Sequence, residues 1–273
     1  MKNNERNIQY FTQSNKEAWN QIMPSHQKVN RAKLDEAFKD NSYSVIKSPE
    51  LEEWNKIGLQ GKDIAHLCCN NGIELMSLNN LGAGRCVGFD ISDLAIEEAQ
   101  ARASLTNSGC EYVCTDVFNI PSQYHSCFDV VYITSGALGW IPDINAFFAK
   151  VKNMLRPKGL IFIYEIHPFI EMLPADTNEN EPALEIIEPY FKKEPYEDSM
   201  GLDYIGRSNT RTTTQFWFVW TISDLIMAMI NQGFNITRFI EYGHDISEIH
   251  SRNAAAGIDI PMSMILIAKG DDQ

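Results

Sequence analysis

The feature that most constrains the fold is the alternation of short apolar runs and helical patterns between Lys62 and Ile166. Apolar runs of this length predict strands, and the segments between them carry apolar residues at helical spacing. Such an order predicts a parallel sheet whose crossover helices cover both faces. The expected strands are residues 63–68, 86–90, 111–115, 128–133 and 160–166.

The chain on either side of this core predicts additions to it. Ser14 and Glu17 have capping-box spacing and predict a helix that ends or bends at Pro24, with more helix over 28–39. Residues 168–220 break the alternation and predict an insertion that ends in an aromatic strand. A further helix over 223–232 and two strands over 235–242 and 262–269 complete the pattern.

The expected fold class is therefore α/β, a Rossmann-like doubly wound seven-stranded mixed sheet with an N-terminal helical cap and an insertion after strand five. We divide the chain into a cap over 1–58, a core over 59–167, an insertion over 168–220 and the C-terminal part of the core over 221–273. With 273 residues and 44% hydrophobic residues, the chain can bury one large core.

The charge and composition of the chain limit the kinds of molecule that it can be expected to bind. The formal net charge of -13 argues against nucleic acid, because phosphate binding needs clustered Lys and Arg. No apolar run approaches the length of a membrane span and the N-terminus is polar, so we expect a cytoplasmic protein without membrane contact. The six cysteines predict reduced, mostly buried thiols. Cys110 and Cys114 have no second pair or nearby histidine, so no metal site is expected.

The carboxyl ends of the predicted strands carry the candidate ligand-binding residues, because ligands bind at that edge of doubly wound sheets. The first strand runs into a turn at 66–72, and the helix after it can hold an anion at its N-terminus. The second strand ends in Asp90, whose carboxylate can accept bonds from ribose hydroxyls. Asp116 and Val117 follow the third strand and suit an adenine edge, and small residues follow the fourth.

Together these features resemble the class I S-adenosylmethionine (SAM)-dependent methyltransferases, in particular the small-molecule, ubiquinone-biosynthesis-type branch. The resemblance covers about residues 60–170 well and the C-terminal strands loosely. It is carried by His66 to Gly72, Val87 to Ser92, Thr115-Asp116, Phe128 to Val131 and Leu155 to Gly159.

The resemblance implies S-adenosyl-L-methionine as cofactor, with its methionine part on the turn, its ribose on the acid after strand two and its adenine on the Asp after strand three. The implied cofactor-binding residues are Cys68, Cys69, Asn70, Gly72, Asp90, Ile91, Asp116, Val117, Thr134 and Ser135.

The turn departs from the family pattern acid-x-Gly-x-Gly-x-Gly. His66 replaces the acid, Cys68 the first glycine and Asn70 the second, and only Gly72 is retained. Asn tolerates positive φ better than most residues and Cys is small, so the turn can still form.

The methyl acceptor is expected to be a small molecule methylated on O, N or C. Transfer from a sulfonium needs alignment, exclusion of water and sometimes a base, so no invariant motif marks the site. The best base candidate is His167, just after Glu165 at the end of strand five, with His26 and His244 as alternatives. Residues that could wall the acceptor pocket, or equally pack in the core, are Trp19, His26, Tyr43, Trp140, Tyr164 and Trp217.

Two other functions stay open on the sequence. A SAM-sensing or catalytically silent binding protein would share every cofactor residue. A nucleotide-dependent oxidoreductase would need Gly-x-Gly-x-x-Gly at the first turn, where Asn70 and Asn71 stand. The oligomeric state is not indicated.

Overall fold

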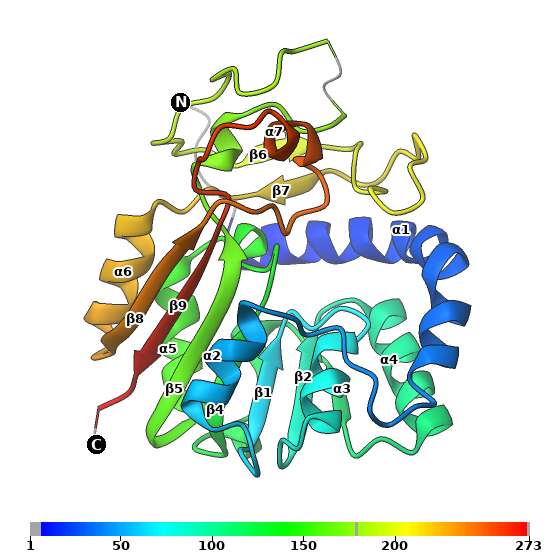
Figure 1. Ribbon diagram of the computed structural model, residues 1–273, viewed down its shortest axis with the longest axis vertical. Helices are drawn as coiled ribbons and strands as arrows, with labels where there is room; N and C mark the ends of the chain where they lie inside the picture. The colour runs from blue at the N-terminus through cyan, green and yellow to red at the C-terminus, as the bar shows by residue number, and fades with distance from the viewer. Residues whose placement is uncertain (1–6, 178–179, 272–273) are drawn as a thin grey trace.

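The computed structural model describes residues 7–177 and 180–271. At its centre lies a seven-stranded sheet with the strand order β3-β2-β1-β4-β5-β9-β8 (Figure 1). Strands β1 to β5 pair in parallel, whereas β9 is antiparallel to both β5 and β8. The predicted fold class is confirmed. The strands are β1 Ile64–Leu67, β2 Cys86–Asp90, β3 Glu111–Cys114, β4 Phe128–Ile133, β5 Leu155–Ile166, β8 Asn235–Tyr242 and β9 Ser263–Lys269.

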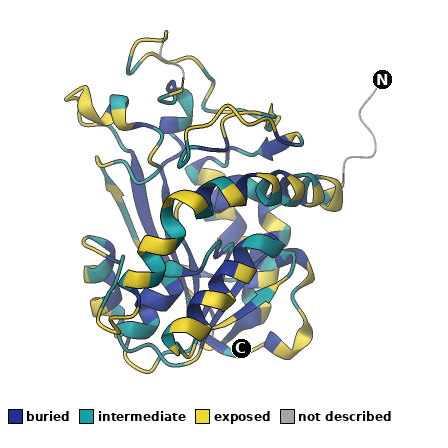
Figure 2. Cartoon of the chain, turned by 90° about the vertical axis from the view of Figure 1, so that its right-hand side faces the viewer, coloured by how far each residue is buried: buried dark blue, intermediate teal, exposed yellow. Residues whose placement is uncertain are grey.

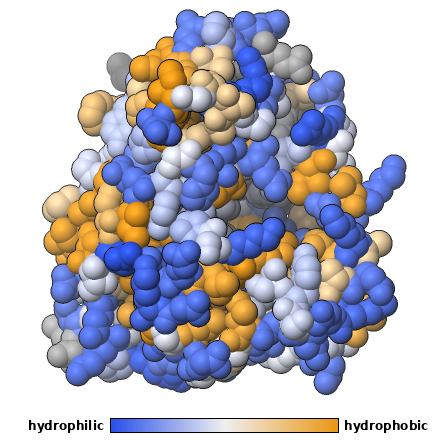
Figure 3. All heavy atoms as spheres, viewed as in Figure 1, coloured by the Kyte–Doolittle hydropathy of each residue, from blue (hydrophilic) through white to orange (hydrophobic). Residues whose placement is uncertain are grey.

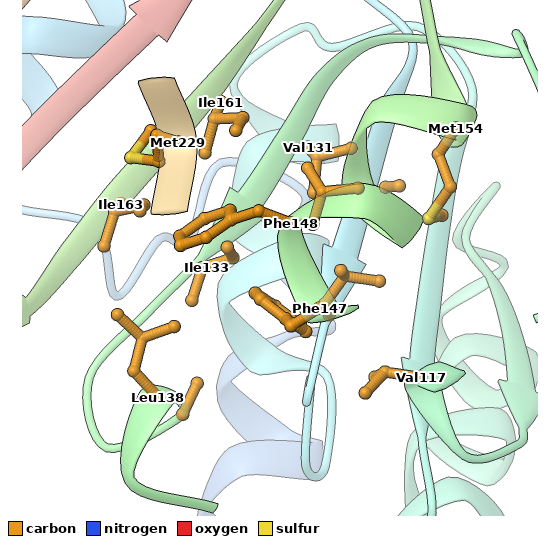
Figure 4. Packing of buried hydrophobic residues seen from close by; sticks show 14 of the residues in the cluster. Val117, Val131, Ile133, Leu138, Phe147, Phe148, Met154, Ile161, Ile163 and Met229 are labelled. Atoms are coloured by element: carbon orange, nitrogen blue, oxygen red, sulfur yellow. The ribbon is translucent and has the colours of Figure 1, made fainter. Parts of the chain in front are cut away.

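Helices cover both faces of the sheet. One face packs against α5 and α6, and the other against α2, α3 and α4. Figure 4 shows Phe147 and Phe148 of α5 lying against Ile133 of β4 and Ile163 of β5. Each such aromatic ring contributes about 2 kcal/mol by leaving water. The helices are α1 Ile8–Ala37, α2 Glu50–Ile57, α3 Ile73–Asn80, α4 Asp93–Thr106, α5 Ile144–Met154, α6 Ile222–Asn231 and α7 Ser251–Ala255.

Short turns of 3-10 helix join several of these elements. They are η1 Val117–Asn119, η2 Ser122–Tyr124, η3 Leu138–Trp140 and η4 Ile170–Met172. Three of them follow strand ends and therefore lie near the edge at which ligands bind in this fold.

The first helix differs from its prediction. It starts at Ile8, where the side chain of Asn7 accepts a hydrogen bond from Tyr10 N, so the capping box predicted at Ser14 is wrong. The Ser14 hydroxyl instead donates to the carbonyl of Thr214 in the insertion. Pro24 lies inside the helix and does not end it, so residues 28–37 continue the same element. Figure 1 draws α1 as a horizontal stretch followed by a descending one.

Strand β5 also starts earlier than expected. It includes residues 155–159, ahead of the expected start at residue 160, because Leu155 pairs with Phe128 of β4 before the register shifts. Lys158 adopts a positive φ of 65° within this stretch. The helix does end there, at Met154, and the same residues then begin the strand.

The insertion and α1 together cover the carboxyl ends of the sheet strands. The insertion contains β6, Tyr196–Asp198, paired antiparallel with β7, Gln215–Trp217, so the predicted aromatic strand is shorter than expected. The Asn15 amide of α1 exchanges two hydrogen bonds with the backbone of Phe216, at 3.0 and 2.7 Å. On the core side, Lys16 forms an ion pair with Asp93 of α4 at 3.0 Å. We call α1 and residues 168–220 the cap.

The outer surface fits this layered arrangement. Figure 2 shows exposed residues along one side of α1 and buried residues on the side toward the sheet. Figure 3 shows hydrophobic residues scattered among hydrophilic ones over the visible face. Within residues 7–177 and 180–271, no helix is long and apolar enough to cross a membrane.

Candidate cofactor and acceptor site

A cavity of about 750 Å³ lies between the carboxyl ends of the strands and the cap. Its walls come from the ends of β1, β2 and β4, from α1, from the insertion and from the loop over 246–250. Every predicted cofactor-binding residue except Gly72 lines it. The topology thus brings to one place residues that the sequence spreads over several strand ends.

The turn after β1 keeps the backbone shape of a glycine-rich loop without its glycines. Cys68, Asn70 and Gly72 have φ values of 54°, 47° and 75°, so left-handed backbone falls at the three positions where the family pattern has glycine. For a non-glycine residue this conformation costs about 1–2 kcal/mol. Gly72 is required for space as well, because a Cβ there would lie 2.3 Å from Tyr112 Cε1.

Three polar contacts hold this strained turn in place. The Asn70 N–H donates to Asp90 Oδ2 at 2.8 Å, the Tyr112 hydroxyl donates to the Gly72 carbonyl at 2.9 Å, and the guanidinium of Arg102 donates to the Asn71 carbonyl at 2.9 Å. Arg102 is itself buried between Glu98 and Asp35 of α1. Side chains of β2, β3 and α4 therefore stabilise a turn that its own residues disfavour.

Asp90 lies at the junction of the turn and the next helix. Its second oxygen, Oδ1, accepts from the Ser92 N–H at 2.8 Å, and the Ser92 side chain caps α4 by accepting from the Ala95 N–H. Burial raises the pKa of Asp90, while its backbone donors act in the opposite direction. Each carboxylate oxygen retains a lone pair toward the cavity, so the group can still accept bonds from a diol.

Asp116 lines the same cavity as Asp90. Its Oδ1 accepts from the Phe118 N–H at 2.9 Å, which caps the short helix η1. Its other oxygen has no hydrogen-bond partner among the residues that the structure describes, and both Asp116 and Val117 line the cavity. Two carboxylates and a left-handed turn at these places fit a nucleoside with a cationic amino-acid arm. SAM, when bound, supplies an activated methyl group on a sulfonium.

His66 occupies the position of the family's acid and is fully buried, with an exposure of 0%. Its ring lies 4.6 Å from the ring of Tyr132, and neither ring nitrogen has a hydrogen-bond partner among the described residues. Burial lowers the pKa of His66 to about 3, so the ring is neutral at pH 7. His66 lines the cavity, and its two unpaired ring nitrogens are an exception to the usual pairing of buried polar atoms.

Four aromatic residues form a continuous wall on the cap side of the cavity. Trp217 of β7 packs edge to face on Trp140 at 4.9 Å, and Trp140 packs in the same way on Trp19 of α1 at 5.6 Å. His26 extends the row from Trp19 at 6.0 Å. All four line the cavity, as the sequence predicts for pocket residues. We call Trp19, His26, Trp140 and Trp217 the aromatic wall.

Two of the predicted pocket residues lie elsewhere. The Tyr43 ring packs on Phe38 at 4.9 Å beneath the end of α1. The Tyr164 hydroxyl bonds to His244 Nε2 at 2.7 Å, so this tyrosine and this histidine engage each other rather than the cavity. Neither tyrosine lines the cavity. Each packs instead against the hydrophobic cluster that α2, α3 and α4 form with the sheet.

The structure does not bring His167 to the cavity either. Its Nε2 lies 2.9 Å from Glu241 Oε1 on β8, and its Nδ1 accepts from the Phe169 N–H at 3.1 Å. Burial lowers its pKa, and Glu241 opposes this effect. His26 does line the cavity, but its Nε2 lies 3.3 Å from Asp203 Oδ1. Burial lowers the pKa of His26 as well.

Sequence reasoning missed two glutamates of the acceptor region. Glu165 of β5 accepts hydrogen bonds from the backbone N–H groups of Gly136, Ala137 and Leu138, at 2.5 to 3.0 Å, and so positions the loop that carries Trp140. A charged residue inside an apolar strand could have indicated such a role. Glu171 of η4 lines the cavity, where burial raises its pKa to about 7 and the neighbouring Trp217 side chain opposes this effect. Nothing local in the sequence marks Glu171.

The six cysteines are free thiols. Cys69 and Cys86 are buried as expected, whereas Cys114 is exposed. Within the described part of the chain, no group of three His, Cys, Asp or Glu residues is arranged to hold a metal ion.

Known proteins that are similar to this chain include methyltransferases, as the residues of the cavity suggest. Residues 64–159 match the profile of a family described as a methyltransferase domain. A tRNA U34 carboxymethyltransferase of Campylobacter hominis is 31% identical over 105 residues, which cover 38% of this chain and 36% of that protein. A protein with the same name from Nautilia profundicola is 24% identical over 223 residues, covering 77% of this chain and 70% of that protein.

A ubiquinone biosynthesis O-methyltransferase of Mesorhizobium japonicum is 29% identical over 114 residues, covering 42% of this chain and 45% of that protein. This chain therefore spans less than half of the length of two of these three curated relatives.

Solved structures share the fold. An S-adenosylmethionine-dependent methyltransferase from Mesorhizobium loti has a TM-score of 0.59 at 23% identity, covering 81% of this chain and 97% of that one. A magnesium protoporphyrin IX methyltransferase from Synechocystis with bound SAH has a TM-score of 0.51 at 15% identity and covers 97% of both chains. Residues 64–159 therefore match a methyltransferase domain, and nine of the ten predicted cofactor-binding residues lie together in one cavity at the edge of that region.

Proposed function

We propose that the chain catalyses transfer of the methyl group of SAM to a small molecule bound in the cavity. The observation that carries this proposal is that one cavity joins the predicted cofactor residues to the aromatic wall under the cap. A donor on the strand ends and an acceptor against the wall would share that space. The cap would exclude water and hold the two reactants in line, which is most of what such a displacement needs.

The names of the curated relatives raise a tRNA acceptor as the alternative. The charge of the site favours the small molecule. Among the described residues that line the cavity there is no Lys or Arg, whereas acids come from both the core and the cap. The lining acids are Glu74, Asp90, Glu98, Asp116, Glu171, Glu188, Asp198 and Glu248. A phosphate backbone needs neutralising cations, and the net charge of the whole chain is -13.

The same charges argue against transfer of a carboxymethyl group. Such a group brings a carboxylate, which a cavity lined by acids would repel unless a cation were present to pair with it. We therefore place the chain with the small-molecule, ubiquinone-biosynthesis-type enzymes in its choice of acceptor. A catalytically silent SAM-binding protein would have the same cofactor-binding residues. Only a measurement of methyl transfer distinguishes it from an enzyme.

The test has two steps. Calorimetric titration with SAM and with its demethylated product measures cofactor binding, and failure of both to bind would refute the proposal. A donor with a labelled methyl group is then offered with a panel of small metabolites and with unmodified tRNA. Label in a small molecule supports the proposal, label in tRNA alone supports the alternative, and binding without label in either supports a silent protein.

A further inference from the structure

The acceptor side of the cavity combines acids that have different partners. Glu188 forms an ion pair with Lys192 at 2.9 Å, and Asp198 accepts from the N–H groups of Ser199 and Met200. Glu171 and Glu248 form no ion pair with any described residue. These two acids therefore leave negative charge facing a cavity that contains no Lys or Arg among its described lining residues.

Both acids line the cavity, Glu171 from the cap and Glu248 from the loop over 246–250. Glu171 is close enough to Trp217 of the aromatic wall for that side chain to lower its pKa against the effect of burial. Burial is the main cause of the raised pKa of Glu74 on α3 and of Tyr204, and the negative charge of Glu248 adds to it; both residues line the same cavity. Glu248 and Glu74 are therefore close enough to interact, although Arg102 offsets part of the negative charge at Glu74.

The aromatic wall lies beside Glu171. Indole faces attract cations more strongly than other aromatic rings, and the attraction grows when water is excluded. Trp217 presses on Gly139, where a Cβ would lie 2.2 Å from its ring, so the ring is held firmly against the loop that carries Trp140. Glu171 therefore lies beside the Trp217 end of an aromatic wall that is packed tightly against this loop.

We infer that the methyl acceptor is an amine, which enters as an ammonium cation and is held between the aromatic wall and Glu171. This inference rests on the proposed function and names its acceptor class. A carboxylic acid would be repelled by the lining acids, and an alcohol, although it can donate a hydrogen bond to the carboxylate, has no positive charge to interact with the indoles. An ammonium group gains from both.

Methyl transfer to an amine needs a group that removes a proton from the ammonium, and Glu171 can serve as that group. An ammonium nitrogen has no lone pair, so one of its protons first passes to the Glu171 carboxylate. The nitrogen lone pair then forms the bond to the methyl carbon, and the carbon–sulfur bond breaks with its electron pair left on sulfur. The methylated product is again an ammonium. Burial raises the pKa of Glu171 to about 7, which makes it a stronger base than an ordinary carboxylate.

Binding of charged and neutral probes of equal shape tests the inference without turnover. The protein is saturated with the demethylated cofactor product and titrated with choline, and separately with the alcohol in which a tert-butyl group replaces the trimethylammonium group. We expect choline to bind at least about tenfold more tightly, a difference of about 1.4 kcal/mol. Equal affinity, tighter binding of the neutral probe, or no binding of choline would overturn the inference.

Substitutions test whether Glu171 is the residue responsible for the preference for choline. Glu171→Gln keeps the shape of the side chain and removes its charge, so it should reduce the preference for choline about tenfold, to near equality. Glu194→Gln, in the same insertion but exposed and outside the cavity, is the matched control and should keep the preference. Unchanged affinity for the demethylated cofactor product shows that each variant is folded. An undiminished preference in Glu171→Gln would refute the assigned role of Glu171.

A turnover screen separates this inference from the proposed function. Phenethylamine, phenylethanol and phenylacetic acid share one skeleton and differ in the accepting group, and they are compared with larger sets built in the same way. Methyl transfer to amines is expected. Transfer to alcohols or acids while the matched amines stay unlabelled would overturn the amine inference and leave the proposed function standing. Absence of SAM binding would refute the proposed function instead.

Discussion

The indole of Trp217 lies directly on Gly139, so closely that a Cβ at residue 139 would come within 2.2 Å of the ring atom Cε2. This contact joins the insertion to the loop that follows β4, and it sets the position of one end of the aromatic wall.

Replacing that glycine should displace the indole. Gly139→Ala is expected to cost about 1–3 kcal/mol in unfolding free energy, as overpacking does, and to raise the KM for the acceptor several-fold. The affinity for SAM should not change. Urea unfolding, steady-state kinetics and calorimetry measure the three quantities. Gly109→Ala is the control, because no atom lies closer than 3.9 Å to a Cβ there. Equal KM values in the two variants would contradict the assignment of the wall to the acceptor.

Asp90 should dominate cofactor affinity. Its carboxylate holds the Asn70 N–H of the strained turn and faces the cavity, so Asp90→Ala removes a ligand contact and a support of the turn together. Hydrogen bonds to charged groups contribute about 1.5–3 kcal/mol each, so the Kd for SAM should rise about 100-fold by calorimetry. Asp259→Ala, on an exposed loop outside the cavity, should bind SAM normally. A Kd within threefold of the unsubstituted protein would refute the predicted ribose site.

Because His66 is buried in its neutral form, we expect the stability difference between the unsubstituted protein and a His66 variant to depend on pH. The ordinary pKa of 6.5 applies to the unfolded chain, whereas burial lowers the folded value to about 3. As the pH falls below 6.5, the unfolded chain binds a proton that the folded protein does not, and His66 therefore destabilises the fold increasingly. His66→Leu escapes this loss, so its stability relative to the unsubstituted protein should grow by about 1.4 kcal/mol for each pH unit between pH 6 and 4.

Urea unfolding at several pH values measures that difference. His125→Leu is the control, since His125 is exposed and its variant should show no comparable trend. If the unpaired nitrogens of His66 meet the cofactor, His66→Leu should also bind SAM more weakly although it folds more stably. A pH-independent difference between His66→Leu and the unsubstituted protein would show that His66 is not buried in its neutral form.

His167 is the base that the sequence predicts, but its ring nitrogens are directed to Glu241 and to the Phe169 backbone. From this geometry, His167→Gln should leave both SAM affinity and kcat within about twofold, because substitutions without contact to the reacting groups change the transition-state free energy little. Single-turnover kinetics measure the methyl-transfer step. A loss of 100-fold or more with unchanged SAM affinity would instead support His167 as the base.

Much of the core could be predicted from the sequence, for local reasons. Buried parallel strands must be apolar, so β4 and β5 are visible as apolar runs. Their carboxyl ends must share one edge of the sheet, so the sequence alone is enough to place Asp90 and Asp116 at the same edge. Two boundaries differ from the prediction: Leu155 pairs with Phe128 and so begins β5 early, and α1 continues through Pro24.

By itself, then, the sequence determined the doubly wound core, the cofactor side of the cavity and the position of the unusual turn, because strand order and strand ends follow from local patterns. Only the tertiary structure decided which aromatic residues line the cavity. Asn15 and Phe216 meet although they lie 201 positions apart, and such a contact leaves no local pattern. The turn illustrates both: Cys68 and Asn70 could adopt left-handed backbone, but Asp90, Arg102 and Tyr112 stabilise it there.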